Sequence, residues 1–380
     1  MKKSLLTART LVAALAMFTL VAACAQKPAA PEAAATPAAP VTAAATPAST
    51  APTGTTGPCE LNVFIWSEYI DPEIVKAFEQ QNNCKVTLDL YEDNESMMAK
   101  LQAGGTSQYD IVVPGNYMVP VMVKLGLLAE LRHENIPNLA NLDDKFVNPS
   151  YDPANKYSAA YQWGTVGIYL RKKGNKPIDE SWSILFDKSK QYGSFLMMDS
   201  IREMMGSALR YQGKAVNSVD PADLKAAAAI LLDAKKRSQG FEGGVGGKNK
   251  VLGKAVDAAV VYNGDAVRGM ADDKDTYFFV PKEGGVLWVD NLAIPAKAPH
   301  RDVAEKFINF ILDAKIGAQL SNFNQYSTPN KAAKAMIKPE DLANPAIYPP
   351  ADLIAKMEFV ADVGDANKLY DEAWTQVKSK

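Results

Sequence analysis

Aromatic side chains and carboxylates recur where the predicted strands of this chain end. Trp66, Glu68 and Tyr69 follow an apolar run at 61–65, and the same residue types return farther along, at Tyr117, Glu203, Tyr262, Asp265, Trp288 and Asp290. Carboxylates hold ammonium groups through charge-assisted hydrogen bonds, and aromatic faces attract cations and cover methylene groups. The joint pattern therefore predicts a cleft that binds an organic cation with an aliphatic stem.

Each of these residues, taken singly, also has a structural explanation. Asp265, like Asp199, stands where a helix N-cap is expected, and aspartate is a favoured cap. Aromatic residues are equally common in protein cores. Asp290 is harder to explain in this way, because it lies in the middle of an apolar strand, where a buried carboxylate needs a partner.

Strand and helix patterns alternate from residue 60 onward. Strands are predicted at 61–65, 85–90 and 109–113, with helices that begin at Asp71-Pro72 and at Asn94 as the N-cap. After a long strand at 163–170, a second series has strands at 194–198, 258–262, 277–280 and 286–295 and helices that begin at Ile201 or cover 221–237 and 301–312. Such an order predicts parallel sheets with helical crossovers, in which ligands bind beyond the carboxyl ends of the strands. We therefore expect an α/β protein of two lobes connected by its long strands.

Composition and charge restrict the classes of function. The net charge of −2 does not suit a nucleic-acid-binding protein, and the two histidines, His133 and His300, exclude a His-rich metal site and leave little room for a Ser-His-Asp hydrolase. The glycine-rich run at 243–248 lacks the spacing and the Ser/Thr of a phosphate-binding loop, so we interpret it as a flexible surface turn. No cofactor, metal site or catalytic residue is predicted.

The N-terminus has the pattern of an export signal. Lys2, Lys3 and Arg9 precede an apolar stretch at 11–23 that is too short to span a bilayer. Small residues lead directly to Cys24, which resembles the lipobox of bacterial lipoproteins, in which the signal is cut before the cysteine and the thiol is acylated. The alternative is an ordinary secretory signal that happens to contain a cysteine. The Ala/Pro/Thr-rich segment that follows predicts an extended tether up to residue 58.

The two remaining cysteines each stand just before a predicted strand. Cys59 precedes the strand at 61–65, and Cys84 precedes the strand at 85–90. If these strands pair in parallel, their starts lie side by side, and a disulfide would persist in an exported protein. The alternative is a pair of buried free thiols.

Several longer stretches together resemble one family. They are Phe64-Ile-Trp-Ser-Glu-Tyr69, Tyr109-Asp-Ile-Val-Val-Pro114, Tyr161-Gln-Trp-Gly164, Pro281-Lys-Glu-Gly-Gly285 and Tyr326-Ser-Thr-Pro-Asn330. The chain resembles, over 59–380, the spermidine/putrescine-binding proteins of bacterial ABC importers. The resemblance implies a type II periplasmic-binding-protein fold, in which each lobe is a mixed sheet flanked by helices and the crossover strands act as the hinge. It also implies a monomer that delivers polyamines to a membrane permease.

The resemblance assigns roles to individual residues. Trp66 and Tyr69 match an aromatic cage with Glu68 beside it, Tyr117 and Tyr326 match further aromatics, Glu203 matches a second-lobe acid, and Trp288 and Asp290 match the pair that stacks on the ligand and grips its ammonium. Four positions, Gly115, Ser200, Tyr262 and Val360, depart from the pattern of spermidine-preferring members. Asp265 and the segment 347–352 resemble putrescine-preferring members, so the preferred ligand length stays open.

The predicted organisation has four parts. Residues 1–23 are the lipoprotein signal, and 24–58 are the lipidated cysteine and linker. The first lobe comprises 59–164 plus 290–332, and the second comprises 165–289 plus 333–380. We expect an extracytoplasmic polyamine receptor anchored to a bacterial membrane by lipid. The alternatives are a receptor for another amine, a polyamine sensor, or a secreted hydrolase that uses two cleft carboxylates as acid and base.

Overall fold

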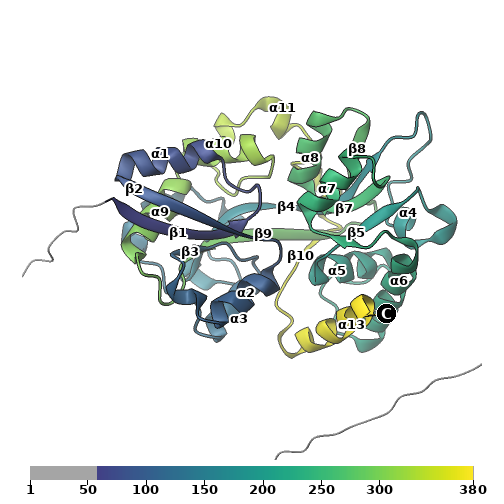
Figure 1. Ribbon diagram of the computed structural model, residues 1–380, viewed down its shortest axis with the longest axis horizontal. Coiled ribbons are helices and arrows are strands. Elements are labelled where there is room, and N and C mark those ends of the chain that lie inside the picture. Colours follow the sequence, from purple (N-terminus) through teal and green to yellow (C-terminus); the bar gives the residue numbers. More distant parts are fainter. Residues whose placement is uncertain (1–57, 380) are drawn as a thin grey trace, which may run out of the picture. The chain divides into compact units, whose positions relative to one another are not determined.

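The computed structural model describes residues 58–379, and Figure 1 shows how their helices and strands are arranged. The predicted signal, Cys24 and the linker up to residue 57 lie outside the described residues. Within the described part, no helix is long and apolar enough to cross a membrane.

The described chain begins with parallel strands and helical crossovers. β1 (Cys59–Trp66) lies between β2 (Cys84–Tyr91) and β3 (Ile111–Val112) and pairs in parallel with both. The crossovers are α1 (Pro72–Asn82) and α2 (Asn94–Gln102), and α3 (Met118–Lys124) follows β3. The predicted strand–helix alternation is confirmed, although the third strand is shorter than expected.

The starts of the first two helices show how local sequence fixes the crossovers. The side chain of Asp71 accepts a hydrogen bond from the Glu73 backbone N–H at 2.9 Å, as expected of an N-cap. In α2 the cap is Asp93, which accepts from the Ser96 N–H at 2.7 Å. The prediction that Asn94 caps this helix is therefore wrong by one residue.

The starts of β1 and β2 lie side by side. Cys59 and Cys84 are register partners in the parallel pair, with their Cα atoms 4.3 Å apart, and their sulfurs form a disulfide. The bond fastens β2, the edge strand of this part of the sheet, to its neighbour.

Two long strands connect the two halves of the sheet. β4 (Ser158–Arg171) and β9 (Val286–Ala293) pair antiparallel, and the strand order is β2-β1-β3-β9-β4-β7-β5-β6. The remaining strands are β5 (Phe195–Met198), β6 (Phe241–Glu242), β7 (Ala258–Tyr262), β8 (Thr276–Phe279), which pairs with β4, and β10 (Glu358–Phe359), which pairs with β9. In Figure 1 these two long strands run through the middle of the described part.

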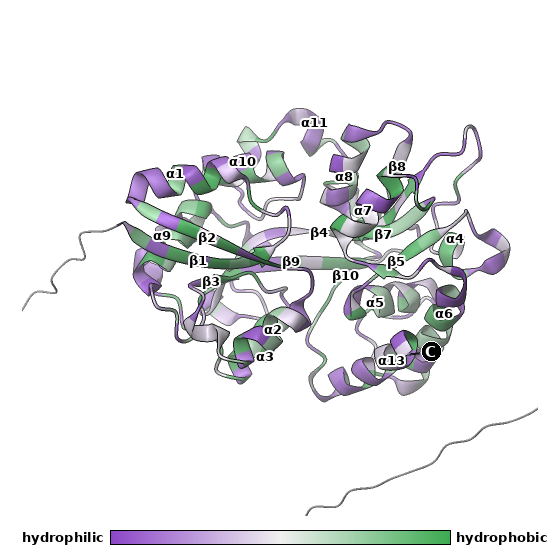
Figure 2. Cartoon of the chain, in the orientation of Figure 1, coloured by the Kyte–Doolittle hydropathy of each residue, from purple (hydrophilic) through white to green (hydrophobic). Residues whose placement is uncertain are grey.

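Helices cover both halves of this sheet. They are α4 (Ser183–Phe186), α5 (Ile201–Tyr211), α6 (Pro221–Arg237), α7 (Gly244–Leu252), α8 (Asn263–Asp272), α9 (Arg301–Ile311), α10 (Ala314–Asn324), α11 (Pro339–Leu342), α12 (Ala351–Ile354) and α13 (Asn367–Ser379). The strands β1 and β7 are largely hydrophobic, whereas α1 and α8 carry hydrophilic residues on their outer sides (Figure 2). The run at 243–248 is the start of α7, so its interpretation as a flexible turn is wrong.

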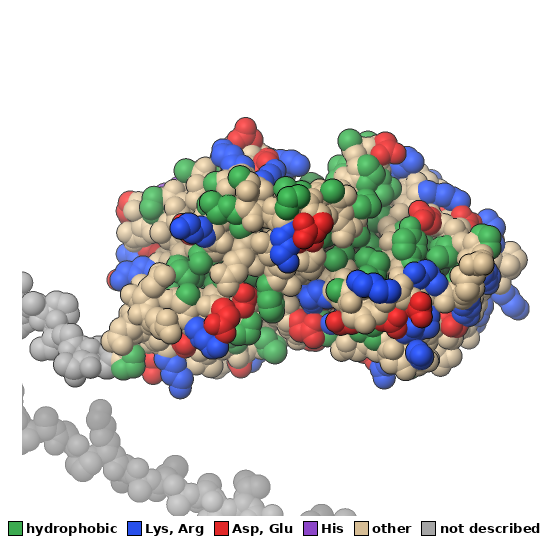
Figure 3. Space-filling model, turned by 90° about the horizontal axis from the view of Figure 1, so that it is seen from above, with side chains coloured by type: hydrophobic (Ala, Val, Ile, Leu, Met, Phe, Trp, Pro, Cys, Tyr) green, Lys and Arg blue, Asp and Glu red, His purple; other side chains and the backbone are tan. Residues whose placement is uncertain are grey.

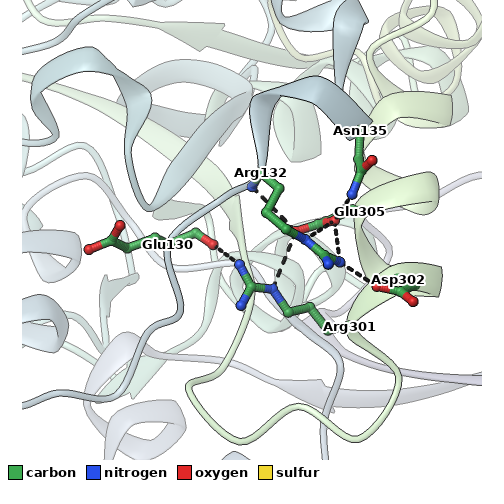
Figure 4. A network of polar contacts seen from close by, with 6 residues as sticks. All are labelled: Glu130, Arg132, Asn135, Arg301, Asp302 and Glu305. Atoms are coloured by element: carbon green, nitrogen blue, oxygen red, sulfur yellow. Dashed lines mark hydrogen bonds and ion pairs between the residues drawn. The ribbon is translucent and has the colours of Figure 1, made fainter. Parts of the chain in front are cut away.

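A buried carboxylate fastens a connecting segment to α9. Glu305 is fully buried and accepts hydrogen bonds from Arg132 Nε at 2.9 Å and from Asn135 Nδ2 at 2.6 Å, with Arg301 beside it (Figure 4). Burial alone would raise the pKa of Glu305, but these hydrogen bonds hold it below its usual value. The network therefore holds the segment between α3 and β4 against α9.

Candidate functional site

A pocket of about 580 Å³ lies where the predicted site residues converge. It is lined by Trp66, Ser67, Tyr69, Glu92, Asn94, Gly115, Asn116, Tyr117, Glu203, Gly244, Val245, Tyr262, Asp265, Trp288, Asp290 and Tyr326. Most of these residues follow the carboxyl ends of β1, β2, β3, β5 and β7 or lie on β9, as expected for an open α/β sheet. All the predicted binding residues except Glu68 line it.

The aromatic residues form one continuous chain of rings along the pocket wall. Neighbouring centroids are 6.5 Å apart for Trp66–Tyr262, 5.6 Å for Tyr262–Trp288, 5.1 Å for Trp288–Tyr326 and 5.4 Å for Tyr326–Tyr69. All four pairs are edge-to-face, an arrangement that aromatic quadrupoles favour. The rings therefore support one another and can surround a stem of methylene groups.

The two tryptophans of the pocket, Trp66 and Trp288, differ in their hydrogen bonding. Trp66 Nε1 donates to the Val113 carbonyl at 3.0 Å, which fixes its indole against β3. Trp288 Nε1 is buried and has no hydrogen-bond partner among the described residues. A buried donor without a partner costs free energy, so Trp288 has a donor available for a bound ligand or water.

Asp290 is the central acid of the pocket. It is 8% exposed, and the Tyr69 hydroxyl donates to its Oδ2 at 2.8 Å. Burial raises the pKa of Asp290 to about 8, since the single bond from Tyr69 opposes the shift only in part and the charge of Glu203 adds to it. A cation that entered the pocket would supply the counter-charge that this carboxylate lacks.

A second group of acids lies around Glu203 at the start of α5. Glu203 is 4% exposed, the Ser200 hydroxyl donates to it, and burial raises its pKa. On the opposite wall, Tyr117 Oη donates to Glu95 Oε1 at 3.0 Å. Burial, and then the charge of Glu203, raise the pKa of Glu95 to about 7. Glu95 was missed by sequence analysis, although its position directly after Asn94, past the end of β2, was the available signal.

Asp265 and Glu68 form ion pairs with basic side chains of the protein. Arg268 lies 2.6 Å from Asp265 Oδ1, and Glu68 Oε2 accepts from Lys248 at 2.8 Å and from Arg268 at 3.0 Å. Burial raises the pKa of Asp265, whereas the charges of Arg268 and Lys248 oppose that rise. The negative charges of Asp265 and Glu68 are thus neutralised by Arg268 and Lys248 without a ligand.

Several lining residues had no assigned role in the sequence. Asn94 Oδ1 accepts from the Gly115 N–H at 2.9 Å, and Asn116 Nδ2 donates to the Val360 carbonyl at 2.6 Å, so the amides tie together segments that surround the pocket. Ser67 and Asn116 belong to strand-end segments already singled out, which was a usable signal. Gly244 and Val245 had none, because α7 was not expected.

The face in Figure 3 shows no large area of one charge. Acidic and basic side chains lie side by side across it. Inside the pocket, Asp290 and Glu203 are buried and each accepts a hydrogen bond from a neutral hydroxyl group.

Comparisons with known proteins agree with this geometry. A match to the bacterial extracellular solute-binding protein family covers residues 73–349. The chain is 34% identical to a spermidine/putrescine-binding periplasmic protein of Salmonella typhimurium, over 84% of this chain and 91% of that protein. It is 33% identical to a putrescine/cadaverine-binding protein of Pseudomonas aeruginosa, over 84% and 93% of the two chains. A solved structure of a putative spermidine/putrescine ABC transporter from Listeria monocytogenes matches with a TM-score of 0.78 and 33% identity, over 84% of this chain and 99% of that one.

Proposed function

The chain belongs to the bacterial extracellular solute-binding protein family, with the two-lobed fold of periplasmic binding proteins, and we propose that it captures polyamines in the pocket and delivers them to an ABC importer. The family consists of transport binding proteins, so the alternative of a hydrolase is excluded. The observation that carries the proposal is Asp290, a buried carboxylate with one donor, Tyr69, in a wall of aromatic rings.

The proposed ligand has two ammonium ends. Asp290 and Glu203 take these ends, and the rings of Trp66, Tyr262 and Trp288 cover the methylene stem between them. The combination of aromatic rings with a few convergent acids is typical of a small-molecule site.

The proposed ligand length rests on the resemblance at two positions, Ser200 and Val360. Ser200 stands where spermidine-preferring relatives have an acid, and the buried Val360 stands where they have an amide side chain. Both changes remove groups that a triamine would use. We propose that putrescine binds at least as well as spermidine, with affinities within about tenfold of each other.

Isothermal titration calorimetry of the purified protein tests this proposal. Putrescine, cadaverine, spermidine and spermine are the ligands, and butylamine is the control, because it has the stem of putrescine with a single ammonium. Saturable binding of putrescine and much weaker binding of butylamine are expected. Equal binding of both would contradict two-ended recognition, and no binding of any polyamine would overturn the proposed function.

The lobes are proposed as 59–164 plus 290–332 and 165–289 plus 333–380. Two contacts support the first, since α9 packs on β1 and α10 packs on α1. The second is supported by α13, which packs on α5 and α6. This division places the pocket between the lobes, so that closure around the ligand would present one continuous surface to a permease.

We also propose that the protein is a monomer held at a bacterial membrane by a lipid on Cys24. The apolar stretch at 11–23, which ends directly at this cysteine, supports the anchor. In cells fed an alkyne fatty acid, the wild type should be labelled and Cys24→Ser should not. Labelling of both would contradict the proposed anchor.

A further inference from the structure

One group of charged residues joins distant segments beside the pocket, and its members Glu68, Lys248 and Arg268 are not among the lining residues. Glu68 lies in the connection between β1 and α1, whereas Lys248 is on α7 and Arg268 on α8. Glu68 Oε2 accepts hydrogen bonds from both cations, at 2.8 Å and 3.0 Å. The contacts join the proposed first lobe to the second.

The buried ammonium group of Lys248 needs its contact with Glu68. The Lys248 side chain is 7% exposed, and Glu68 is the partner that its ammonium has among the described residues. A buried ammonium without a counter-ion is strongly unfavourable, whereas the same group in water is not. Glu68 therefore favours the closed arrangement, in which Lys248 is buried.

Arg268 extends the group to the pocket wall. Besides Glu68, it contacts Asp265 Oδ1 at 2.6 Å and donates from Nη1 to the Asn324 carbonyl at 2.8 Å, at the end of α10. Its guanidinium thus connects α8 to two segments of the proposed first lobe. Asp265, which is 4% exposed, is held by this arginine instead of facing the pocket as a free charge.

The glycines at the start of α7 allow this close approach. A Cβ on Gly244 would lie 2.7 Å from Asp265 Oδ2 and 2.8 Å from a ring carbon of Tyr262. A Cβ on Gly243 would lie 3.1 Å from Glu92 Oε2, which belongs to the opposite wall. Larger residues at these positions would require Asp265, Tyr262 or Glu92 to shift, so the glycines permit the close packing seen at the start of α7.

We propose that Glu68, Lys248, Arg268 and Asp265 form an ionic latch that holds α7 and α8 over the occupied pocket and slows release of the ligand. The proposal rests on the proposed function. It assigns Glu68 and Asp265 to closure and leaves Asp290 and Glu203 as the acids that meet the ligand. Lys248 and Arg268 are accordingly positioning residues for ligand retention.

Stopped-flow measurement of putrescine dissociation tests the latch. Glu68→Gln and Lys248→Gln should each speed dissociation roughly three- to tenfold, as expected for loss of a partly buried ion pair. The double variant should dissociate about as fast as Glu68→Gln alone, because Glu68→Gln already removes the contact that is lost in Lys248→Gln. If Lys248 acted only by repelling the cationic ligand, Lys248→Gln would slow dissociation instead.

The control is Glu73→Gln, which removes an exposed acid paired with Lys76 on its own helix. The melting temperatures of the ligand-free Glu68→Gln and Lys248→Gln variants should match that of this control, because the latch acts in the closed state. Slower release from Lys248→Gln, additive effects in the double variant, or an equal loss of ligand-free stability would each overturn the latch. Failure of the wild type to bind any polyamine would overturn the proposed function and the latch together.

Discussion

At the scale of single residues, the pocket depends on acids that folding leaves without counter-ions. Asp290 and Glu203 are almost fully buried, and each accepts a hydrogen bond from a neutral hydroxyl, of Tyr69 and Ser200 respectively. Asp265 is equally buried but is paired with Arg268. A buried acid can therefore either stay available for a ligand or form an ion pair within the protein, and its neighbours in the tertiary structure decide which.

Asp290→Asn should weaken putrescine binding about ten- to a hundredfold. A hydrogen bond to a charged group is worth about 1.5–3 kcal/mol, and the amide keeps the shape while losing the charge. Calorimetry measures the change, with Asp199→Asn, an acid paired with Lys378 away from the pocket lining, as the control. An unchanged affinity together with a lower melting temperature would show that Asp290 has only a structural role.

Binding should release protons near neutral pH. Because the pKa of Asp290 is raised to about 8 and that of Glu95 to about 7, both are protonated to a large extent in the ligand-free protein at pH 6. A cation binds the ionised form of Asp290, so affinity should rise as the pH increases from 6 to 8. Calorimetry at pH 7 in buffers of different ionisation enthalpy measures the released protons. The release should fall in Asp290→Asn, and a buffer-independent enthalpy in the wild type would contradict the assignment.

At the scale of elements, the crossing strands carry the pocket floor. On β4, Gly164 is the register partner of Trp288 on β9. A Cβ at this position would come within 2.5 Å of the indole ring and would also meet the side chain of Asn263. The strand therefore needs glycine here because an aromatic ring of the binding wall occupies the space.

Gly164→Ala should lower both the melting temperature and the affinity for putrescine, because Trp288 must move. Where there is room, replacing glycine by alanine usually stabilises a protein by about 0.4–1 kcal/mol. Gly285→Ala is the matched control, since its nearest neighbour would be 3.6 Å away. Thermal denaturation and calorimetry of both variants give the comparison. Equal melting temperatures and affinities in the two variants would mean that the residues around Gly164 can shift to accommodate a methyl group.

At the scale of the whole molecule, the site is assembled from segments far apart in the chain. Trp66 ends β1 and Tyr69 follows it, Glu203 comes from α5, and Tyr326 comes from the segment after α10. A ligand that contacts all of these walls stabilises the arrangement in which they are close. Ligand binding and closure are therefore expected to be coupled.

Putrescine should make the protein more compact in solution. Small-angle X-ray scattering of the purified protein should show a smaller radius of gyration at saturating ligand, and Asp290→Asn should need more ligand for the same change. The wild type with butylamine is the control. An identical radius of gyration with and without bound putrescine would contradict closure.

The sequence by itself determined the order of strands and helices and most of the pocket. The alternation of apolar runs is set by local geometry, and parallel strands bring their carboxyl ends to one edge, so residues such as Trp66, Tyr117 and Glu203 could be predicted to converge. The pairing of Cys59 with Cys84 followed from the same argument, since both precede strands that lie side by side.

Only the tertiary structure decided which acidic and basic side chains form ion pairs. Nothing in the sequence indicated that Glu68 contacts Lys248 and Arg268, which are 180 and 200 residues away along the chain. The glycine-rich run was expected to be a turn, but it begins a helix that approaches Asp265 and Tyr262 closely. Neither result follows from local periodicity, because both depend on how closely segments distant in the sequence approach one another when the sheet is complete.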